Sequence, residues 1–122
     1  MHEMGIALQI VDIAKASIPE DMVSPRVEHI HLKVGKLAAV IVDNLKFCFE
    51  IAAKETVLAG ADLVVEEIPV TARCRQCNAQ WTIDEPVFLC RDCQSGDLEI
   101  LSGRELDIES IDVLEEDEKD AV

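Results

Sequence analysis

The sequence predicts an α+β fold, in which two helices pack on a three-stranded sheet and a small segment with four cysteines is inserted before the last strand. Two stretches carry apolar residues at helical spacing, and three others read as strands, one of them strictly alternating. The order along the chain is helix, strand, helix, strand, cysteine segment, strand. Such an order can form a two-layer domain with both helices on one face of the sheet.

Two helices are expected, over about residues 3–17 and about residues 43–55. Pro19 helps to end the first. The apolar face of the first helix is predicted from Met4, Ala7, Leu8, Val11 and Ala14. The apolar face of the second is predicted from Leu45, Cys48, Phe49 and Ala52. A cysteine in such a stripe behaves as a small hydrophobe, so Cys48 is left out of any metal site.

Three strands are expected. In RVEHIHLKV, one face is predicted from Ile30, Leu32 and Val34, the other from His29, His31 and Lys33, and Gly35 closes the strand. The run ADLVVEEIPV predicts a second strand, and ELDIESIDVLEE a third. In the third, the apolar phase slips between Ile108 and Ile111, which predicts a bulge.

The cysteines give the strongest local signal. Two Cys-x-x-Cys pairs, CRQC and CRDC, are separated by twelve residues and contain Cys74, Cys77, Cys90 and Cys93. Two such knuckles can surround one ion tetrahedrally, and a site closed by four thiolates is typical of structural zinc. Disulfides are disfavoured in a cytosolic protein. Iron uses the same four ligands, and the sequence does not distinguish it from zinc.

Composition narrows the function classes. The formal net charge is −14, and nine acidic residues and one lysine lie between Glu105 and Val122. This charge disfavours nucleic-acid binding. No signal peptide is evident, and no apolar run reaches the roughly 20 residues that span a bilayer. We expect a cytoplasmic protein without membrane insertion, with a discontinuous α/β domain (1–70 and 104–114), a zinc-binding domain (71–103) and an acidic tail (115–122).

Several stretches together resemble the HypA/HybF family of nickel metallochaperones for nickel–iron hydrogenase maturation. They are the MHE start, HLKVGKL, NLKFCFEIAAKET, GADLVVEEIPV, the two knuckles and CQSGDLEILSGRELDIESIDV. The resemblance extends to about Val113. It implies a nickel-binding amino-terminal domain, a zinc domain, and delivery of nickel to the hydrogenase large subunit with a HypB-type GTPase as partner.

The resemblance gives the MHE start a chemical role. Nickel(II) with nitrogen donors favours a square-planar arrangement. The amine of Met1, the backbone nitrogens of His2 and Glu3, and the imidazole of His2 offer four nitrogens in one short loop. The Glu3 side chain could also orient His2 by a hydrogen bond. Without the resemblance, a histidine beside a helix start is more often an exposed residue than a ligand.

The predicted function is therefore that of a non-enzymatic carrier of Ni(II) with structural Zn(II), a monomer or weak homodimer. No nucleophile–base pair and no glycine-rich phosphate loop stand out in the sequence. A zinc-ribbon interaction module without a nickel role is the alternative, and electron transfer through an iron site is a third class. His29 and His31 could in principle hold a metal, but no third ligand is evident near them, so they are expected to be structural or solvated.

Overall fold

The structure is a computed structural model that describes residues 2–115. The chain forms two compact units. Of the described residues, unit 1 contains 2–32, 40–65 and 108–115, and unit 2 contains 33–39 and 66–107. The domain limits expected from the sequence remain predictions. Among the described helices, none is long and apolar enough to cross a membrane.

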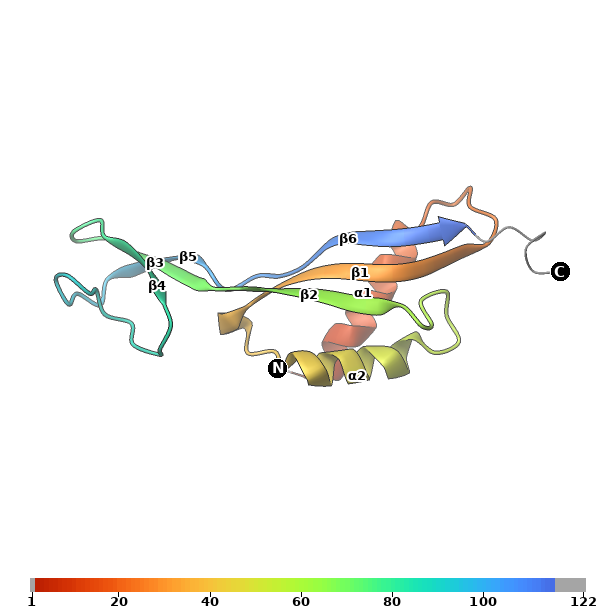
Figure 1. Cartoon of the computed structure of the whole chain (residues 1–122), viewed down its shortest axis with the longest axis horizontal. Helices are drawn as coiled ribbons and strands as arrows, with labels where there is room; N and C mark the ends of the chain where they lie inside the picture. The colour runs from red at the N-terminus through yellow and green to blue at the C-terminus, as the bar shows by residue number, and fades with distance from the viewer. Residues whose placement is uncertain (1, 116–122) are drawn as a thin grey trace. The chain divides into compact units, whose positions relative to one another are not determined.

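Unit 1 has the predicted two-layer arrangement. A three-stranded sheet has the order β2-β1-β6, and two helices cover one of its faces (Figure 1). The helices are α1 (Glu3–Ser17) and α2 (Val42–Ala53). The strands are β1 (Pro25–Gly35), β2 (Asp62–Ile68) and β6 (Leu106–Glu115), of which residues 33–35, 66–68 and 106–107 belong to unit 2. The predicted α+β class is confirmed, and the first helix has the predicted bounds.

The helix faces differ in part from the prediction. Ala7, Val11 and Ala14 are buried as expected, but Met4 and Leu8 are 36% and 51% exposed. The buried arc of α1 is completed by Ile6 and Ile10 instead. The apolar residues of α1 extend around much of the helix, so spacing alone did not fix which arc faces the sheet. In α2, Leu45 and Phe49 are buried, whereas Cys48 is half-buried.

The strand faces follow the predicted alternation. Ile30, Leu32 and Val34 are buried, whereas His29 and His31 on the opposite face are partly exposed. In β6 the partly buried positions shift phase between Ile108 and Ile111, at the point where the sequence pattern slips. The first β-strand therefore presents an apolar face to the helices and a polar face to solvent.

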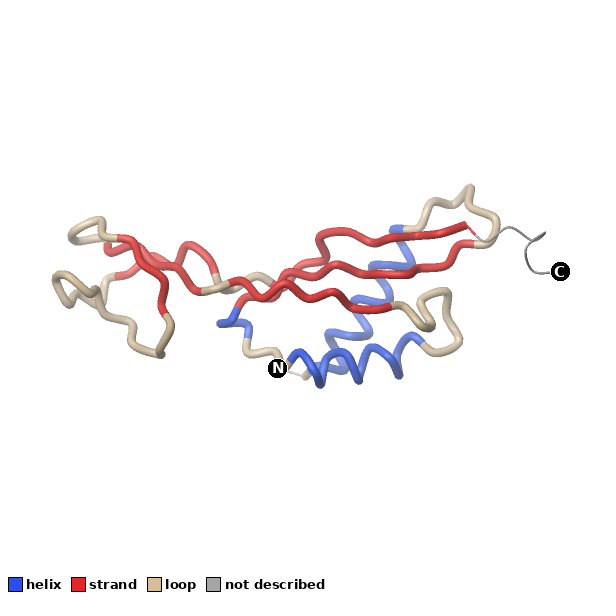
Figure 2. The backbone as a smooth tube through the Cα atoms, in the orientation of Figure 1, coloured by secondary structure: helices blue, strands red, loops and turns tan. Residues whose placement is uncertain are grey.

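Unit 2 contains a second sheet with the order β4-β3-β5. Its strands are β3 (Val70–Cys74), β4 (Gln80–Ile83) and β5 (Leu98–Ser102), and both pairings are antiparallel. The strands are short, and the connection between β4 and β5 is much longer than that between β3 and β4 (Figure 2). A short 3₁₀ helix, η1 (Lys36–Ala38), also belongs to this unit. These elements were not expected from the sequence.

The apolar core of unit 2 is small. Only Val70, Ala72 and Ile83 form its buried cluster, with Trp81, Leu98 and Ile100 packed partly against it. Burying a few side chains of this size contributes only about 1.5–3 kcal/mol each. Ordering the roughly fifty residues of unit 2 costs far more conformational free energy than that. A unit of this kind needs a further source of stability.

Two glycines of unit 2 meet at close range. A Cβ added to Gly35 would lie 2.0 Å from the carbonyl oxygen of Gly103, and Gly103 itself has a φ of 116°. The Leu37 amide donates to the same Gly103 oxygen at 2.7 Å, and the Gly35 amide donates to the Glu105 oxygen at 2.7 Å. The atoms that a Cβ would strike are backbone atoms held by these bonds, so they cannot move aside cheaply.

We therefore predict opposite effects for two glycine-to-alanine changes. Gly35→Ala should lower the free energy of unfolding by about 3 kcal/mol or more, because its Cβ collides with fixed backbone. Gly5→Ala is the matched control, since nothing lies within 4 Å of the added Cβ in α1. It should stabilise by up to about 1 kcal/mol through helix propensity. Chemical denaturation of both variants measures this, and equal stabilities would contradict it.

Candidate metal centres

The two Cys-x-x-Cys knuckles of unit 2 have the same local backbone. After Cys74, the Asn78 amide donates to the Cys74 oxygen at 2.8 Å; after Cys90, the Gln94 amide donates to the Cys90 oxygen at 2.9 Å. Asn78 and Gln94 occupy equivalent places and both have left-handed backbone, with φ of 64° and 60°. A residue of that conformation turns the chain back on itself, so each knuckle presents its two thiols in one direction.

The four sulfurs converge on one point. The thiol sulfurs of Cys74, Cys77, Cys90 and Cys93 all lie within 4.8 Å of one another. The distances between Cys74 and Cys93 and between Cys77 and Cys90 are both 3.5 Å. Sulfurs bound tetrahedrally to zinc at about 2.3 Å are about 3.8 Å apart. The four sulfurs and the distances between them therefore fit a single zinc ion bound by four thiolates.

The site is closed on one side and accessible on the other. The first cysteine of each knuckle is buried, with Cys74 at 0% and Cys90 at 1% exposure, whereas the second of each is exposed. Four thiolates leave no open coordination position for a substrate. The arrangement is that of a structural site rather than a catalytic one.

The thiols affect one another electrostatically. The backbone amide of Cys93, assisted by that of Asp92, lowers the pKa of Cys90 to about 6, although burial opposes this. At Cys77 the Ala79 amide lowers the pKa, but Cys90, burial and the remaining thiols outweigh it and raise the pKa to about 12. The Cys90 thiol therefore ionises readily, whereas ionisation of its neighbour Cys77 is disfavoured. A divalent cation removes this conflict, because it stabilises all four thiolates at once.

Strand β5 supports the first knuckle from outside. The Arg75 guanidinium donates to the Asp97 carboxylate at 3.0 Å and to the Leu98 carbonyl at 3.2 Å. The Arg75 amide also donates to the Asp97 carbonyl at 3.0 Å. Two residues earlier, in β3, Arg73 forms an ion pair with Glu99 of β5. These contacts hold Arg75, which lies inside the knuckle between Cys74 and Cys77, and do not involve the sulfurs themselves. They therefore restrict how the first knuckle can turn relative to β5.

The predicted nickel residues lie at the start of α1. His2 is exposed and takes the N-cap position, with extended backbone (φ −85°, ψ 110°) and no capping hydrogen bond from its side chain. Its carbonyl accepts the first helical bond, from the Ile6 amide at 3.3 Å. Glu3 is the first helical residue. Met1 lies outside the described residues.

A second polar cluster was missed by the sequence analysis. Asp112 on β6 lies beside both histidines of β1, with its Oδ2 at 3.2 Å from His29 Nδ1 and 2.9 Å from His31 Nε2. The sequence showed no third polar group near the two histidines. Asp112 is such a group, and it lies 81 residues after His31 in the chain. The pairing of β1 with β6 brings it there, and only the order of strands in the sheet could have indicated it.

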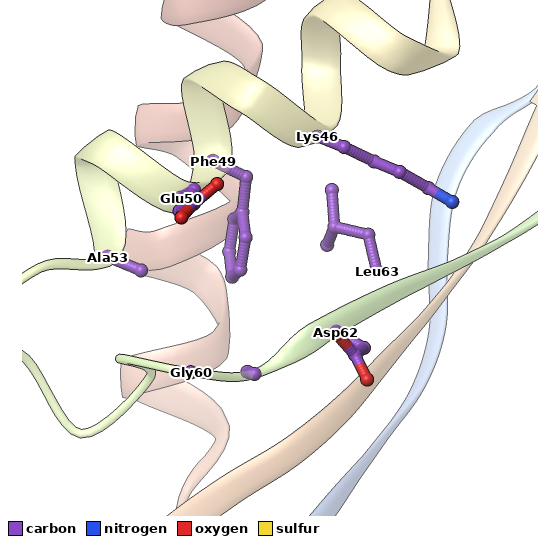
Figure 3. Close-up of a pocket in the computed structure, with 8 residues that line it drawn as sticks. Lys46, Phe49, Glu50, Ala53, Gly60, Asp62 and Leu63 are labelled. Carbon is purple, nitrogen blue, oxygen red and sulfur yellow. The ribbon is translucent and has the colours of Figure 1, made fainter.

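Unit 1 also has a groove between α2 and the start of β2, with a volume of about 400 Å³ (Figure 3). Phe49 forms its apolar wall, and the charged groups of Lys46, Glu50 and Asp62 lie around it. No cysteine or histidine is among the residues that line it, so it offers no soft or nitrogen ligand to a transition metal.

Comparison with known proteins identifies the family. The model of a family described as "Hydrogenase/urease nickel incorporation, metallochaperone, hypA" matches residues 1–113. The chain belongs to the HypA family. The resemblance read from the MHE start, the knuckles and the last strand is thereby confirmed. The family is one of metallochaperones, and the four-cysteine site described above is consistent with that membership.

Named relatives and solved structures agree with the HypA assignment. A hydrogenase maturation factor HypA of Desulfosudis oleivorans is 55% identical over 94% of this chain and 100% of its own length. One from Desulfatibacillum aliphaticivorans is 51% identical over 97% of this chain and 91% of its own. The solution structure of the nickel metallochaperone HypA from Helicobacter pylori covers 95% of this chain with a TM-score of 0.65, at 19% identity. At that identity the structure supports the fold alone.

The cysteine site generates a paired prediction. Cys74→Ala removes one buried ligand, so metal analysis should show the bound zinc falling from one ion per chain towards zero, with loss of ordered amide signals from residues 71–102. Unit 1 should keep its helical signal, because its core is formed by other residues. Cys48→Ala is the matched control, since Cys48 is outside the four-sulfur cluster. Full zinc content in the Cys74 variant would contradict the assignment.

Proposed function

We propose that this chain carries Ni(II) at its amino terminus and delivers it to the large subunit of a nickel–iron hydrogenase, while Zn(II) in the four-cysteine site stabilises unit 2. The observation that carries the nickel proposal is the position of His2, which is exposed and extended immediately before α1. Family membership supports it, since the family description names nickel incorporation and the relatives are named for hydrogenase maturation.

The start of a helix is suited to this ligand set. The first amides of an α-helix have no carbonyl partner within the helix. The backbone nitrogens of His2 and Glu3 are therefore not needed for helical hydrogen bonds. Together with the Met1 amine and the His2 imidazole, they offer four nitrogens in a plane, which Ni(II) favours. The Glu3 side chain provides at most an orienting hydrogen bond to His2.

A carrier must also release its ion. A ligand set at an exposed chain end is open to an incoming ligand from the acceptor, whereas a closed four-thiolate site is not. We therefore assign the cargo to the amino terminus and the resident ion to the cysteines. In this proposal the chain acts in the cytoplasm as a monomer or weak homodimer and catalyses no reaction itself, and a HypB-type GTPase supplies nucleotide hydrolysis.

The nickel proposal makes a prediction for each of three changes in the MHE start. His2→Ala should weaken nickel binding by at least a hundredfold, because it removes the imidazole. Adding residues before Met1 should also weaken it, because the terminal amine becomes an amide of far poorer donor strength. Glu3→Ala is the control, since it keeps the backbone nitrogen and should change affinity by about tenfold at most. Calorimetric titration of zinc-loaded proteins measures all three.

These variants also separate the alternatives. A zinc-ribbon interaction module without a nickel role predicts no tight nickel binding by the unmodified protein and no effect of either change. A site made from scattered histidines predicts an effect of His2→Ala but none of the extension. Zinc content should stay the same in all of the variants, because the cysteines are unchanged. Unaltered nickel affinity in the extended protein would exclude the Met1 amine as a ligand.

The proposed GTPase contact is expected on unit 1. Leu8 and Ile13 of α1 are 51% and 53% exposed, which leaves apolar area on the helix that carries the nickel ligands. Leu8→Asp should reduce retention of the chain by the immobilised GTPase at least fivefold, whereas Cys93→Ala should reduce it less. Leu101→Asp, at an exposed apolar position of unit 2, is the matched control. The reverse ranking would locate the interface in unit 2.

A further inference from the structure

Strand β4 is an open edge of the sheet in unit 2. The sheet has the order β4-β3-β5, so β4 pairs on one side only among the strands that the structure describes. Native proteins protect such an edge with charged residues or proline. The sequence of β4, QWTI, contains neither, whereas the other edge strand, β5, carries Glu99 in an ion pair with Arg73. Strand β4 is therefore the less protected edge of this sheet.

The pairing of β4 with β3 shows which backbone groups lie on the open side. The Cys74 amide donates to the Ala79 carbonyl at 2.8 Å, so these two residues form a hydrogen-bonded pair. Hydrogen-bonded and non-hydrogen-bonded pairs alternate along an antiparallel ladder. Trp81, two residues after Ala79, is therefore directed towards β3 again. The amides and carbonyls of Gln80 and Thr82 point to the open side, where a further strand can pair with them.

A groove follows this open side. One cavity of about 390 Å³ is lined by β4 and by the loop after it, with Val87 and Leu89 of the loop facing the same space as Trp81. A second cavity, of about 370 Å³, shares Trp81 and Arg91 with the first and extends to Ala79. Val87 and Leu89 are 55% and 49% exposed, so their apolar groups are accessible. The groove thus combines open backbone groups with an apolar wall.

The charge of the groove favours one kind of occupant. Asp84 and Glu85 line the first cavity just after β4, and neither carboxylate has an ion-pair partner in the part of the chain that the structure describes. Two such carboxylates attract a lysine or arginine. A second copy of this chain carries the same net charge of −14, and a nucleic acid carries phosphates, so like charge disfavours both. A basic segment of another protein fits the charge.

We propose that the open side of β4 binds an extended, basic segment of a partner protein, which adds a strand to the sheet of unit 2. The backbone of the segment pairs with Gln80 and Thr82, and one of its apolar side chains packs against Trp81 and Leu89. A lysine or arginine of the segment lies near Asp84. Because β4 offers only two residues for pairing, the complex is weak and transient. This surface contains none of the proposed nickel or zinc ligands, so it adds an interaction to the proposed function.

Trp81 provides the signal for testing this surface, because it is the single tryptophan of the chain. The zinc-loaded protein is titrated with a capped basic peptide, KVTVKVT, while the fluorescence of Trp81 is followed. We expect a saturable change, with the amide signals of Gln80 and Thr82 shifting in parallel NMR spectra. The acidic peptide EVTVEVT has the same apolar pattern and should bind about fivefold more weakly or worse, because Asp84 and Glu85 repel it.

A proline at position 82 tests the backbone contact. Thr82 lies opposite Thr71 at a non-hydrogen-bonded position, so Thr82→Pro removes the outward amide and leaves the ladder to β3 intact. It should weaken binding of the basic peptide about tenfold or more. Thr82→Val is the matched control, because it keeps the amide and should change the affinity by about twofold at most. Both variants must retain their zinc and a thermal midpoint near that of the unmodified protein.

A second pair of variants tests the apolar wall without altering charge or backbone. Leu89→Ala should weaken binding of the basic peptide about threefold or more, because it removes apolar area from the groove. Leu101→Ala is its control, since Leu101 is 44% exposed on the other edge strand, β5, and should leave binding unchanged. Leu89 is itself exposed, so this test stands even if Thr82→Pro loses its zinc.

Four results would overturn the proposal. The first is the absence of any saturable change with the basic peptide, and the second is equal affinity for the basic and acidic peptides. The third is equal affinity in the Thr82→Pro and Thr82→Val proteins, which would exclude strand addition. The fourth is self-association of the unmodified chain that Thr82→Pro abolishes, because it would assign the edge to a second copy. The nickel ligands take no part in these measurements, so failure of the nickel proposal is seen separately.

Discussion

Four thiols within 4.8 Å of one another are the constraint on which unit 2 depends. The apolar cluster of that unit is too small to order its loops, and the thiols cannot all ionise beside one another without a cation. An ion satisfies both requirements, because it cross-links two distant knuckles and stabilises their charge. The equivalent backbone of the two knuckles follows from the same need, since each must deliver two sulfurs from a tight turn.

The candidate sites differ in how they hold an ion, and this difference fits different roles. Four sulfurs on two turns give a soft, closed site that retains its ion. In the proposed nickel site, nitrogens at a chain end would give a planar, open arrangement from which an acceptor can remove the ion. Ligand type and exposure, rather than affinity alone, would then direct each metal to one of the two sites.

The sequence predicted those features that depend on local pattern. The bounds of α1, the alternating face of β1 and the four cysteines could all be read from spacing. It did not predict which arc of α1 is buried, because Leu8 and Ile10 are equally apolar and only the sheet decides between them. The strands of unit 2 were missed because they are four or five residues long. Asp112 was missed because its place beside His31 is set by strand order.

Inserting unit 2 before the last strand has an energetic consequence for unit 1. Strand β6 must return to pair with β1 after the whole insertion, and the cost of closing that connection rises slowly with its length, by about 0.6 kcal/mol for each doubling. An ordered unit 2 shortens the flexible part of the connection, since the Ser102 hydroxyl donates to the Pro69 carbonyl at 2.8 Å. Without the proposed zinc ion, this connection would become flexible again. The penalty to unit 1 is small compared with the burial of Ile30, Leu32 and Leu45 in its core, so its fold should outlast that of unit 2.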